Sequence, residues 1–95
     1  MFDIADVQQF QSVGNYTRVF FNQQNPMTYR SLSQVEERLP DDIFFRANRS
    51  NIVNLNWVRD LQQSISGAFQ LTLENGNVVE LSQRKSSEFK KRWTL

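Results

Sequence analysis

Residues 44–58 read FFRANRSNIVNLNWV and are the most informative stretch of this 95-residue chain. The run opens with Phe44 and Phe45, as a buried strand would. Arg46 and Arg49 follow, three residues apart, among short polar residues. Arginine forms two parallel hydrogen bonds with phosphate or guanine, and asparagine offers the donor and acceptor pair that adenine requires. A strand that serves only a core has no use for so many forked donors and amides, so this run predicts a nucleic-acid surface.

Length and composition limit the other possibilities. Ninety-five residues make one domain, residues 1–95, and eight Phe, two Trp and two Tyr give its core bulky material. The chain has no Cys and no His, which excludes disulfides, thiolate metal sites and the usual general base. No nucleophile–base pair, phosphate loop or metal cluster is evident, so we expect neither an enzyme nor a cofactor. No apolar run approaches a membrane span, and we expect a cytoplasmic protein.

The charge is small but unevenly spread. The net charge is +1; residues 1–45 hold three basic and six acidic residues, and residues 46–95 hold eight basic and four acidic ones. A net charge near zero argues against a protein that binds nucleic acid only as a nonspecific polycation. The asymmetry permits a local basic face, which nucleic-acid binding requires, although differences of this size also arise by chance.

The first half of the chain predicts strands and one helix. Residues 16–21 (YTRVFF) form a strand after a Gly14-Asn15 turn and can pair with residues 27–29 across a polar loop. Ser31 and Gln34 have capping-box spacing, and apolar residues then recur at helical intervals until Pro40. This predicts a helix of about two turns with an acidic outer face.

The second half predicts a strand, a hairpin and a basic helix. A strand at residues 44–47 leads through an Asn-rich connection to a strand at residues 58–63. Residues 68–81 alternate apolar and polar around Asn75-Gly76, which is typical of a tight hairpin. From Ser82 to near Trp93 the pattern predicts a basic helix with Phe89 and Trp93 inward. The predicted fold is mainly β, antiparallel, with two short helices.

The order and spacing of these segments resemble the LytTR family of DNA-binding domains, from about Asp3 to Trp93. The stretch DIADVQQFQSVGNYTRVFF resembles the family's opening strands and Gly-Asn-Tyr turn. The stretch YRSLSQVEERLPDDIFFRANRSNIVNLNWV resembles its helix, Leu-Pro turn and signature strand. The end, FQLTLENGNVVELSQRKSSEFKKRW, resembles its final hairpin, Ser-x-Arg segment and basic helix.

The resemblance implies a fold, a function and a site. Its members have elongated antiparallel β-sheets whose loops enter successive major grooves, and they are usually output domains that follow a phosphorylatable receiver domain. It implies a bacterial transcriptional regulator of a two-component system that binds promoter repeats in double-stranded DNA. This chain would be the C-terminal part of a longer regulator with an upstream receiver or sensory domain. The implied DNA-binding residues lie in three segments: Asn15, Thr17 and Arg18; Asn48, Arg49, Ser50 and Asn51; and Ser82, Arg84 and Lys85.

Two positions depart from the family pattern. Asn48 stands where histidine is usual before Arg49, and Thr17 is smaller than the long polar residue of some members. Both changes are compatible with DNA binding, and both bear on which base pairs are read.

Several residues also have plain structural interpretations. Arg49 could pair with Asp41, Asp42 or Asp60, although the resemblance favours DNA. Arg46 lies at an odd separation from Arg49 on what we expect to be one strand, so it would face the other way and serve the structure, or at most contact a phosphate. Asn54 would cap its own turn. Glu36, Glu37, Asp41 and Asp42 would be solvated charges, not metal ligands.

Two classes of function remain at this point. One is sequence-specific binding of duplex DNA. The other is a β-rich interaction module that binds a protein or peptide, with its arginines as rim charges. Steep salt dependence of binding to duplex DNA would separate them.

Overall fold

The two predicted helices and the antiparallel sheets are present in a computed structural model that describes residues 3–21 and 23–93. Its extents of 37 × 23 × 21 Å make the molecule elongated. The elements are a 3-10 turn η1 (Ile4–Asp6), β1 (Val7–Val13), β2 (Tyr16–Phe21), β3 (Met27–Thr28), α1 (Leu32–Glu36), β4 (Phe44–Asn48), β5 (Asn51–Asn54), a 3-10 turn η2 (Leu55–Trp57), β6 (Val58–Gln63), β7 (Phe69–Leu73), β8 (Val78–Glu80) and α2 (Gln83–Trp93).

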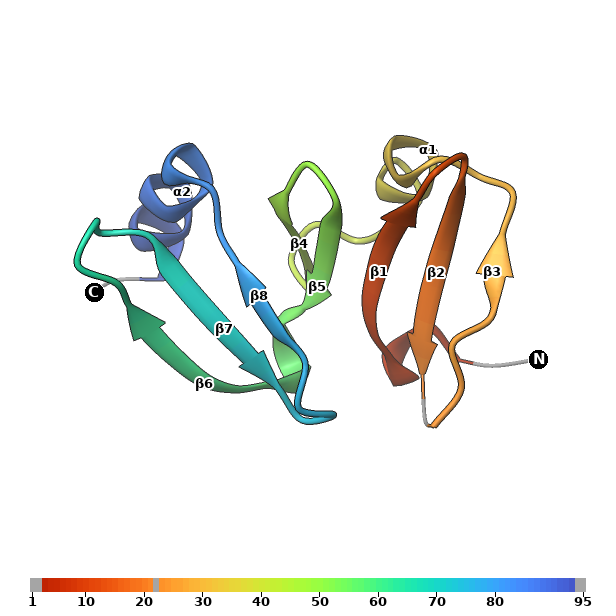
Figure 1. Ribbon diagram of the computed structural model, residues 1–95, viewed down its shortest axis with the longest axis horizontal. Helices are drawn as coiled ribbons and strands as arrows, with labels where there is room; N and C mark the ends of the chain where they lie inside the picture. Colours follow the sequence, from red (N-terminus) through yellow and green to blue (C-terminus); the bar gives the residue numbers. More distant parts are fainter. Residues whose placement is uncertain (1–2, 22, 94–95) are drawn as a thin grey trace.

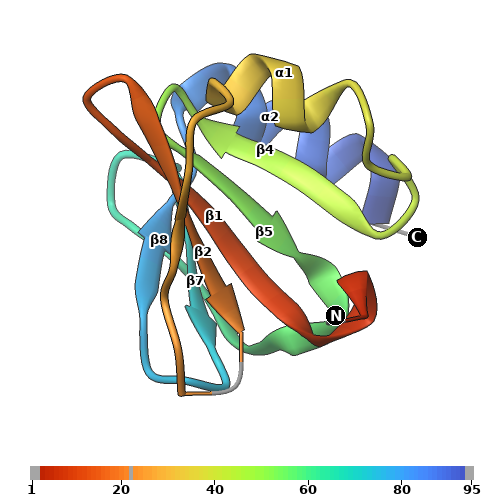
Figure 2. The same ribbon diagram turned by 90° about the vertical axis from the view of Figure 1, so that its right-hand side faces the viewer.

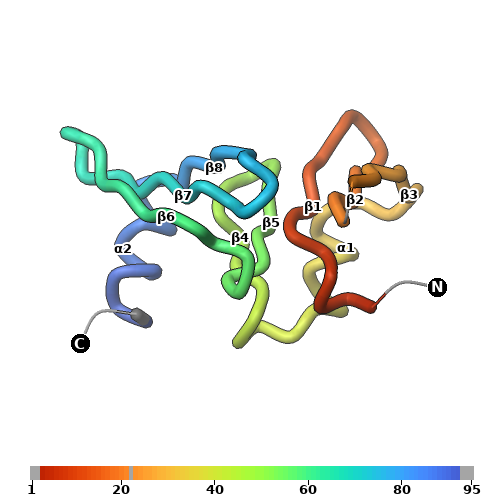
Figure 3. The backbone as a smooth tube through the Cα atoms, turned by 90° about the horizontal axis from the view of Figure 1, so that it is seen from below, coloured from red at the N-terminus to blue at the C-terminus, as the bar shows by residue number. Residues whose placement is uncertain are grey.

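The strands form two antiparallel sheets. The first has five strands in the order β3-β2-β1-β5-β4, and the second has three in the order β6-β7-β8. Figure 1 shows the sheets side by side along the long axis, with the β4–β5 hairpin at the edge of the first sheet that faces the second. Figure 3 shows α1 and α2 on the same side of the molecule, one near each sheet.

The β4–β5 hairpin contributes to two hydrophobic cores because its side chains alternate between its faces. Phe44 and Ile52 belong to a core that β1, β2 and α1 complete. Phe45 and Val53 belong to a second core with β7, β8 and the segment after β8. A hairpin buried on both faces joins the two sheets into one body.

Two predictions for the middle of the chain need correction. Part of the expected Asn-rich connection is a strand, because β5 pairs with β4 on one side and with β1 on the other. The first helix covers only Leu32–Glu36, although its capping box of Ser31 and Gln34 is confirmed. Leu39 still packs against the first core from the turns that follow the helix.

The predicted C-terminal hairpin and helix are confirmed. β7 and β8 pair around a turn in which Gly76 has φ +91°, a conformation that favours glycine. Phe89 of α2 packs against the second core. The side chain of Trp93 lies outside the described residues. No helix in residues 3–21 and 23–93 has the length and apolar character needed to span a membrane.

Asn54 caps its own turn, as predicted, and also joins β5 to the start of β1. Its side chain is fully buried. The side-chain oxygen accepts a hydrogen bond from the Asn56 backbone N–H at 2.9 Å, and Nδ2 donates to the Val7 carbonyl at 2.9 Å. A buried amide with both ends bonded contributes to stability, and its removal leaves two backbone groups unpaired.

We predict that Asn54→Ala lowers the free energy of unfolding by about 1–3 kcal/mol, because two backbone groups near the buried amide lose their partners. Urea unfolding followed by tryptophan fluorescence measures this value. Asn56→Ala is the matched control, since the side chain of Asn56 is exposed and only its backbone takes part in the turn. Equal stability of the two variants would contradict the assigned role.

Candidate nucleic-acid interface

Three segments that are distant in sequence meet along one edge of the molecule. They are the β1–β2 turn, the β4–β5 turn and the start of α2, which all lie at the upper edge in Figure 1 and at the upper end in Figure 2. The Ser12 N–H donates to the Ser50 carbonyl at 2.8 Å, which ties β1 to the β4–β5 turn. The Ser82 N–H donates to the Ala47 carbonyl at 3.0 Å, which ties the start of α2 to β4. Most of the predicted DNA-binding residues therefore lie on one connected edge.

A shallow depression of about 360 Å³ lies between the β4–β5 turn and the start of α2. It combines four basic side chains with polar ones and one carboxylate. Its lining residues are Glu36, Arg46, Asn48, Arg49, Ser82, Arg84 and Lys85.

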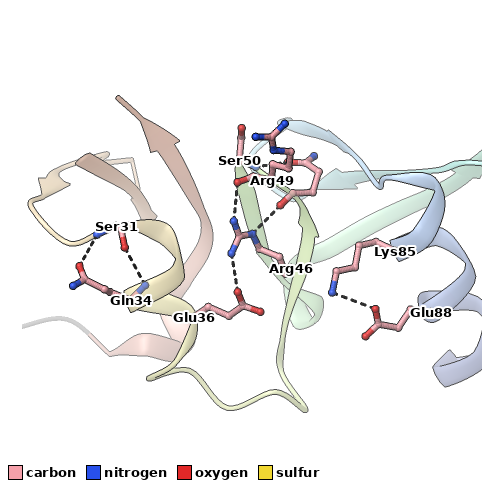
Figure 4. A network of polar contacts seen from close by, with 9 residues as sticks. Ser31, Gln34, Glu36, Arg46, Arg49, Ser50, Lys85 and Glu88 are labelled. Atoms are coloured by element: carbon pink, nitrogen blue, oxygen red, sulfur yellow. Dashed lines mark hydrogen bonds and ion pairs between the residues drawn. The ribbon is translucent and has the colours of Figure 1, made fainter. Parts of the chain in front are cut away.

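Arg46 supports the β4–β5 turn from beneath (Figure 4). Its Nε donates to the Asn48 carbonyl at 2.8 Å, and one terminal nitrogen donates to the Arg49 carbonyl at 2.7 Å. The other terminal nitrogen forms an ion pair of 2.7 Å with Glu36 of α1. The predicted structural role of Arg46 is confirmed. The reason given for it was wrong, since Arg49 lies in the turn and not on the same strand.

Asn48 and Asn51 belong to a chain of side-chain amides that runs from the turn into the interior. Asn48 Nδ2 donates to the Glu80 carbonyl at 2.6 Å, and Asn48 Oδ1 accepts from Asn51 Nδ2 at 3.2 Å. Asn51 Oδ1 accepts from Gln9 Nε2 at 2.7 Å, and Gln9 Oε1 accepts from Asn77 Nδ2 at 2.9 Å. The two predicted contact residues thus have internal partners, and their amides join the two sheets.

Five predicted residues are exposed on this edge: Asn15, Arg49, Ser50, Ser82 and Arg84. Figure 4 shows the Arg49 guanidinium directed away from Arg46. Within the described part of the chain, no carboxylate lies within ion-pair distance of Arg49 or Arg84. The alternative pairing of Arg49 with Asp41, Asp42 or Asp60 is therefore absent. Unpaired arginines at a surface are available to bind an anion.

Thr17 differs from the other residues of the first segment. Its side chain is fully buried, and its hydroxyl donates to the Arg30 carbonyl at 2.8 Å. Thr17 therefore joins β2 to the segment after β3 and has no side-chain surface for a base. Arg18, the next residue, is half-buried on the opposite face of β2.

Lys85 and Ser82 are partly engaged within the protein. The Lys85 ammonium lies 3.2 Å from the Glu88 carboxylate and 5.6 Å from the centre of the Phe45 ring. Ser82 Oγ accepts from the Lys85 N–H at 3.2 Å and so caps the first turn of α2. Both remain at the rim of the depression.

The opposite edge of the molecule carries carboxylates. η1, with Asp6, and the β7–β8 turn, with Glu74, lie at the lower edge in Figure 1. Among residues 3–21 and 23–93, no group of three or more carboxylates is placed to hold a metal ion. The carboxylates of η1 and of the β7–β8 turn thus lie away from the edge that carries Arg49 and Arg84.

The family model for the LytTr DNA-binding domain matches residues 1–94. The chain belongs to this family. A solved LytTr DNA-binding domain from Bacillus cereus superposes with a TM-score of 0.87 at 30% sequence identity, over 96% of this chain and 84% of that one. The mainly β architecture with two short helices is therefore the fold of the family.

Curated relatives share part of their length with this LytTr domain. The sensory transduction protein LytT of Enterococcus faecalis is 30% identical over 77 residues, which is 81% of this chain and 32% of the relative. The heme-containing CO-sensing transcriptional regulator RcoM 1 of Paraburkholderia xenovorans is 33% identical over 61 residues, which is 64% of this chain and 23% of the relative. The matched region is 23–32% of the length of these proteins.

Sequence reasoning missed two residues that shape this interface. Glu36, interpreted as a solvated helix charge, is the ion-pair partner of Arg46, ten positions away on another element. Gln9 was not singled out, yet it links Asn51 to Asn77 across the two sheets. Neither contact has a signal in local spacing, since each depends on how separate elements pack.

We predict that Arg46→Ala lowers the free energy of unfolding by about 1–3 kcal/mol, because two turn carbonyls lose a charged donor. Glu36→Gln should cost only about 0–1 kcal/mol, since its side chain is 47% exposed against 17% for Arg46. Chemical denaturation of the two variants measures both values. A larger loss for Glu36→Gln than for Arg46→Ala would contradict the view that Arg46 acts mainly through the turn carbonyls.

Proposed function

We propose that this LytTr domain binds duplex DNA sequence-specifically, as part of a bacterial transcriptional regulator, through turns that enter successive major grooves. The observation that carries the proposal is the meeting of the β1–β2 turn, the β4–β5 turn and the start of α2 on one edge, with Arg49 and Arg84 unpaired at its surface. Family membership supports DNA as the partner. The turns, and not a recognition helix, would do the reading.

The shape of the edge supports contact with more than one groove. The long axis of the domain measures 37 Å, close to the roughly 34–36 Å of one turn of B-DNA. The three segments are spread along this axis in Figure 1. A duplex lying along the edge would therefore present a groove to each end of the interface.

We propose a division of roles within the predicted set. Arg49 and Arg84 would read base edges, because a guanidinium matches guanine with two parallel hydrogen bonds. Asn15 and Ser50 would add contacts from exposed turns, while Arg18, Ser82 and Lys85 would contact phosphates. Thr17, Asn48 and Asn51 would act through the shape of the turns, since their polar groups have partners inside the protein.

We further propose that this domain is the output part of a longer cytoplasmic regulator. Its relatives are three to four times longer than the matched region and bear names such as sensory transduction protein and CO-sensing transcriptional regulator. An upstream receiver or sensory domain would control the DNA-binding half, and promoter repeats would be its targets.

The experiment that tests the function is selection of bound duplexes from a random pool. We expect enrichment of a short motif, and of paired motifs spaced by about one helical turn when two copies of the domain are tethered. Binding to the enriched site should weaken steeply as salt rises. Absence of any enriched sequence would contradict the proposal and favour the interaction-module alternative.

We predict that Arg49→Ala weakens binding to the selected site by about 1–3 kcal/mol and relaxes preference at one base pair, because a bidentate contact is lost. Fluorescence anisotropy with the selected site and its single-base variants measures both effects. Arg59→Ala on the exposed edge strand β6 is the matched control and should bind as wild type does. A folded Arg49→Ala variant with unchanged affinity and preference would refute the assignment.

We also predict that Arg84→Ala weakens binding more than Lys90→Ala does. Both side chains are exposed cations on α2, but Arg84 lines the depression and Lys90 lies six residues, or about 9 Å, further along the helix. Titration of both variants against the same duplex tests the difference. Equal losses, each with the salt slope lowered by about one unit, would mean that both residues contact only phosphates.

A further inference from the structure

Two tyrosines form an exposed pair at the end of the molecule farthest from α2. Tyr29 is 85% exposed and Tyr16 is 41% exposed, and no other described aromatic side chain is in the exposed class. The pairing of Thr17 with Thr28 places the two tyrosines opposite each other on β2 and just after β3. Their ring centres lie 5.1 Å apart with an interplanar angle of 58°. Large aromatic surface left in water is unusual enough to suggest a partner.

Two arginines accompany this pair. Arg18 lies two residues from Tyr16 on the same face of β2, because side chains alternate along a strand. Arg30 directly follows Tyr29 and is exposed. Within the described residues, neither arginine has a carboxylate at ion-pair distance. The segments around the pair therefore carry two phenol hydroxyls and two guanidinium groups that have no carboxylate partner among the described residues.

The backbone around the pair is held at both ends. The buried hydroxyl of Thr17 donates to the Arg30 carbonyl, so the segment after β3 is tied to β2. One residue later, Ser31 begins the capping box of α1. A surface whose backbone is already fixed loses little entropy when it binds a rigid partner.

The position of this surface relates it to the interface already described. Tyr16 directly follows Asn15 of the β1–β2 turn. The connection from β3 to α1 continues the upper edge in Figure 1 beyond that turn, on the side away from α2. A duplex that lies along the edge would reach this surface with the sequence that flanks the motif.

We propose that Tyr16, Tyr29, Arg30 and Arg18 form a flank-binding surface that grips the sugar-phosphate backbone outside the base-reading turns. The proposal rests on the proposed DNA-binding function and extends the interface past the β1–β2 turn. Tyrosine hydroxyls and arginines are common donors to phosphate oxygens, and the rings would pack on deoxyribose. The tilted rings cover part of each other, which suits backbone contact better than stacking on a base.

Backbone contacts carry affinity without sequence information. The flank-binding surface should therefore raise affinity equally for any flanking sequence and should require that the duplex extend far enough to reach it. Arg30→Ala should reduce the salt slope by about one unit, the value for one phosphate contact.

The test uses the selected site in three duplexes: one with long flanks on both sides, and one trimmed at each end in turn. With long flanks, Arg30→Ala and Tyr29→Ala should each weaken binding by about three- to tenfold, as expected for the loss of one ordinary hydrogen bond or of its equivalent in packing. Tyr29→Phe should have an intermediate effect because it keeps the ring and loses the hydroxyl. On the duplex trimmed at the contacted end, the affinity of the wild-type domain should fall by a similar factor. The substitutions should then cause no further loss of affinity.

The controls separate this proposal from the proposed function. Ile65→Ala and Arg59→Ala remove an exposed apolar side chain and an exposed arginine elsewhere, and both should bind as wild type does. Arg49→Ala should weaken binding on all three duplexes alike. If Tyr29→Ala should fail to fold, Tyr29→Phe and Arg30→Ala carry the test.

Wild-type affinity of Arg30→Ala and of the Tyr29 variants on every duplex, with Arg49→Ala still impaired, would overturn the flank-binding surface and leave the DNA-binding function standing. Losses that persist on both trimmed duplexes would also overturn it, because the residues would then act within the motif. If wild type itself selects no site, the proposed function and this extension fail together.

Discussion

The whole structure depends on one constraint, which is that the β4–β5 hairpin is buried on both faces. Phe44 and Ile52 fill one core, and Phe45 and Val53 fill the other. Because successive side chains point to opposite faces, four adjacent apolar positions on two paired strands serve both sheets. A hairpin in this position has no freedom to slip by one residue, since a slip would exchange its two faces. The turn at its end is therefore presented at a fixed place between the sheets.

Within a few residues, that turn contains side chains that stabilise it and side chains that remain available at the surface. Arg46, Asn48 and Asn51 direct their polar groups inward, toward backbone carbonyls and a chain of amides, while Arg49 and Ser50 remain at the surface. The inward groups leave no buried side-chain nitrogen or oxygen unpartnered among the described residues. A turn held by such a network is rigid, and rigid donors lose less entropy when they meet a ligand. The many amides of this run thus have a structural reason that is separate from any contact with bases.

Much of the candidate site could be predicted from local patterns. The Gly14-Asn15 turn, the 68–81 hairpin and the start of the second helix follow from turn residues, alternation and capping, which depend on neighbours in sequence. The internal role of Thr17 could not be predicted, because its burial depends on the packing of the segment after β3 against β2. The same applies to Asn48, whose amide bonds to a carbonyl 32 positions away. In the sequence, a polar residue that will be exposed cannot be distinguished from one that will be buried, because burial depends on the position of the neighbouring strand.

By itself, the sequence determined most of the elements, the family and the segments that carry the interface. Periodicity, turn residues and motif order can be recognised in the sequence without knowledge of the tertiary structure. Only the tertiary structure decided that β5 is a strand, that Arg49 lies in a turn while Arg46 supports it, and that Tyr16 and Tyr29 lie against each other. Each of these depends on how strands and turns pack, and the pairing of β5 with β1 joins segments far apart in the chain. Such contacts are set by the packing of two cores around one hairpin, which no short window of sequence contains.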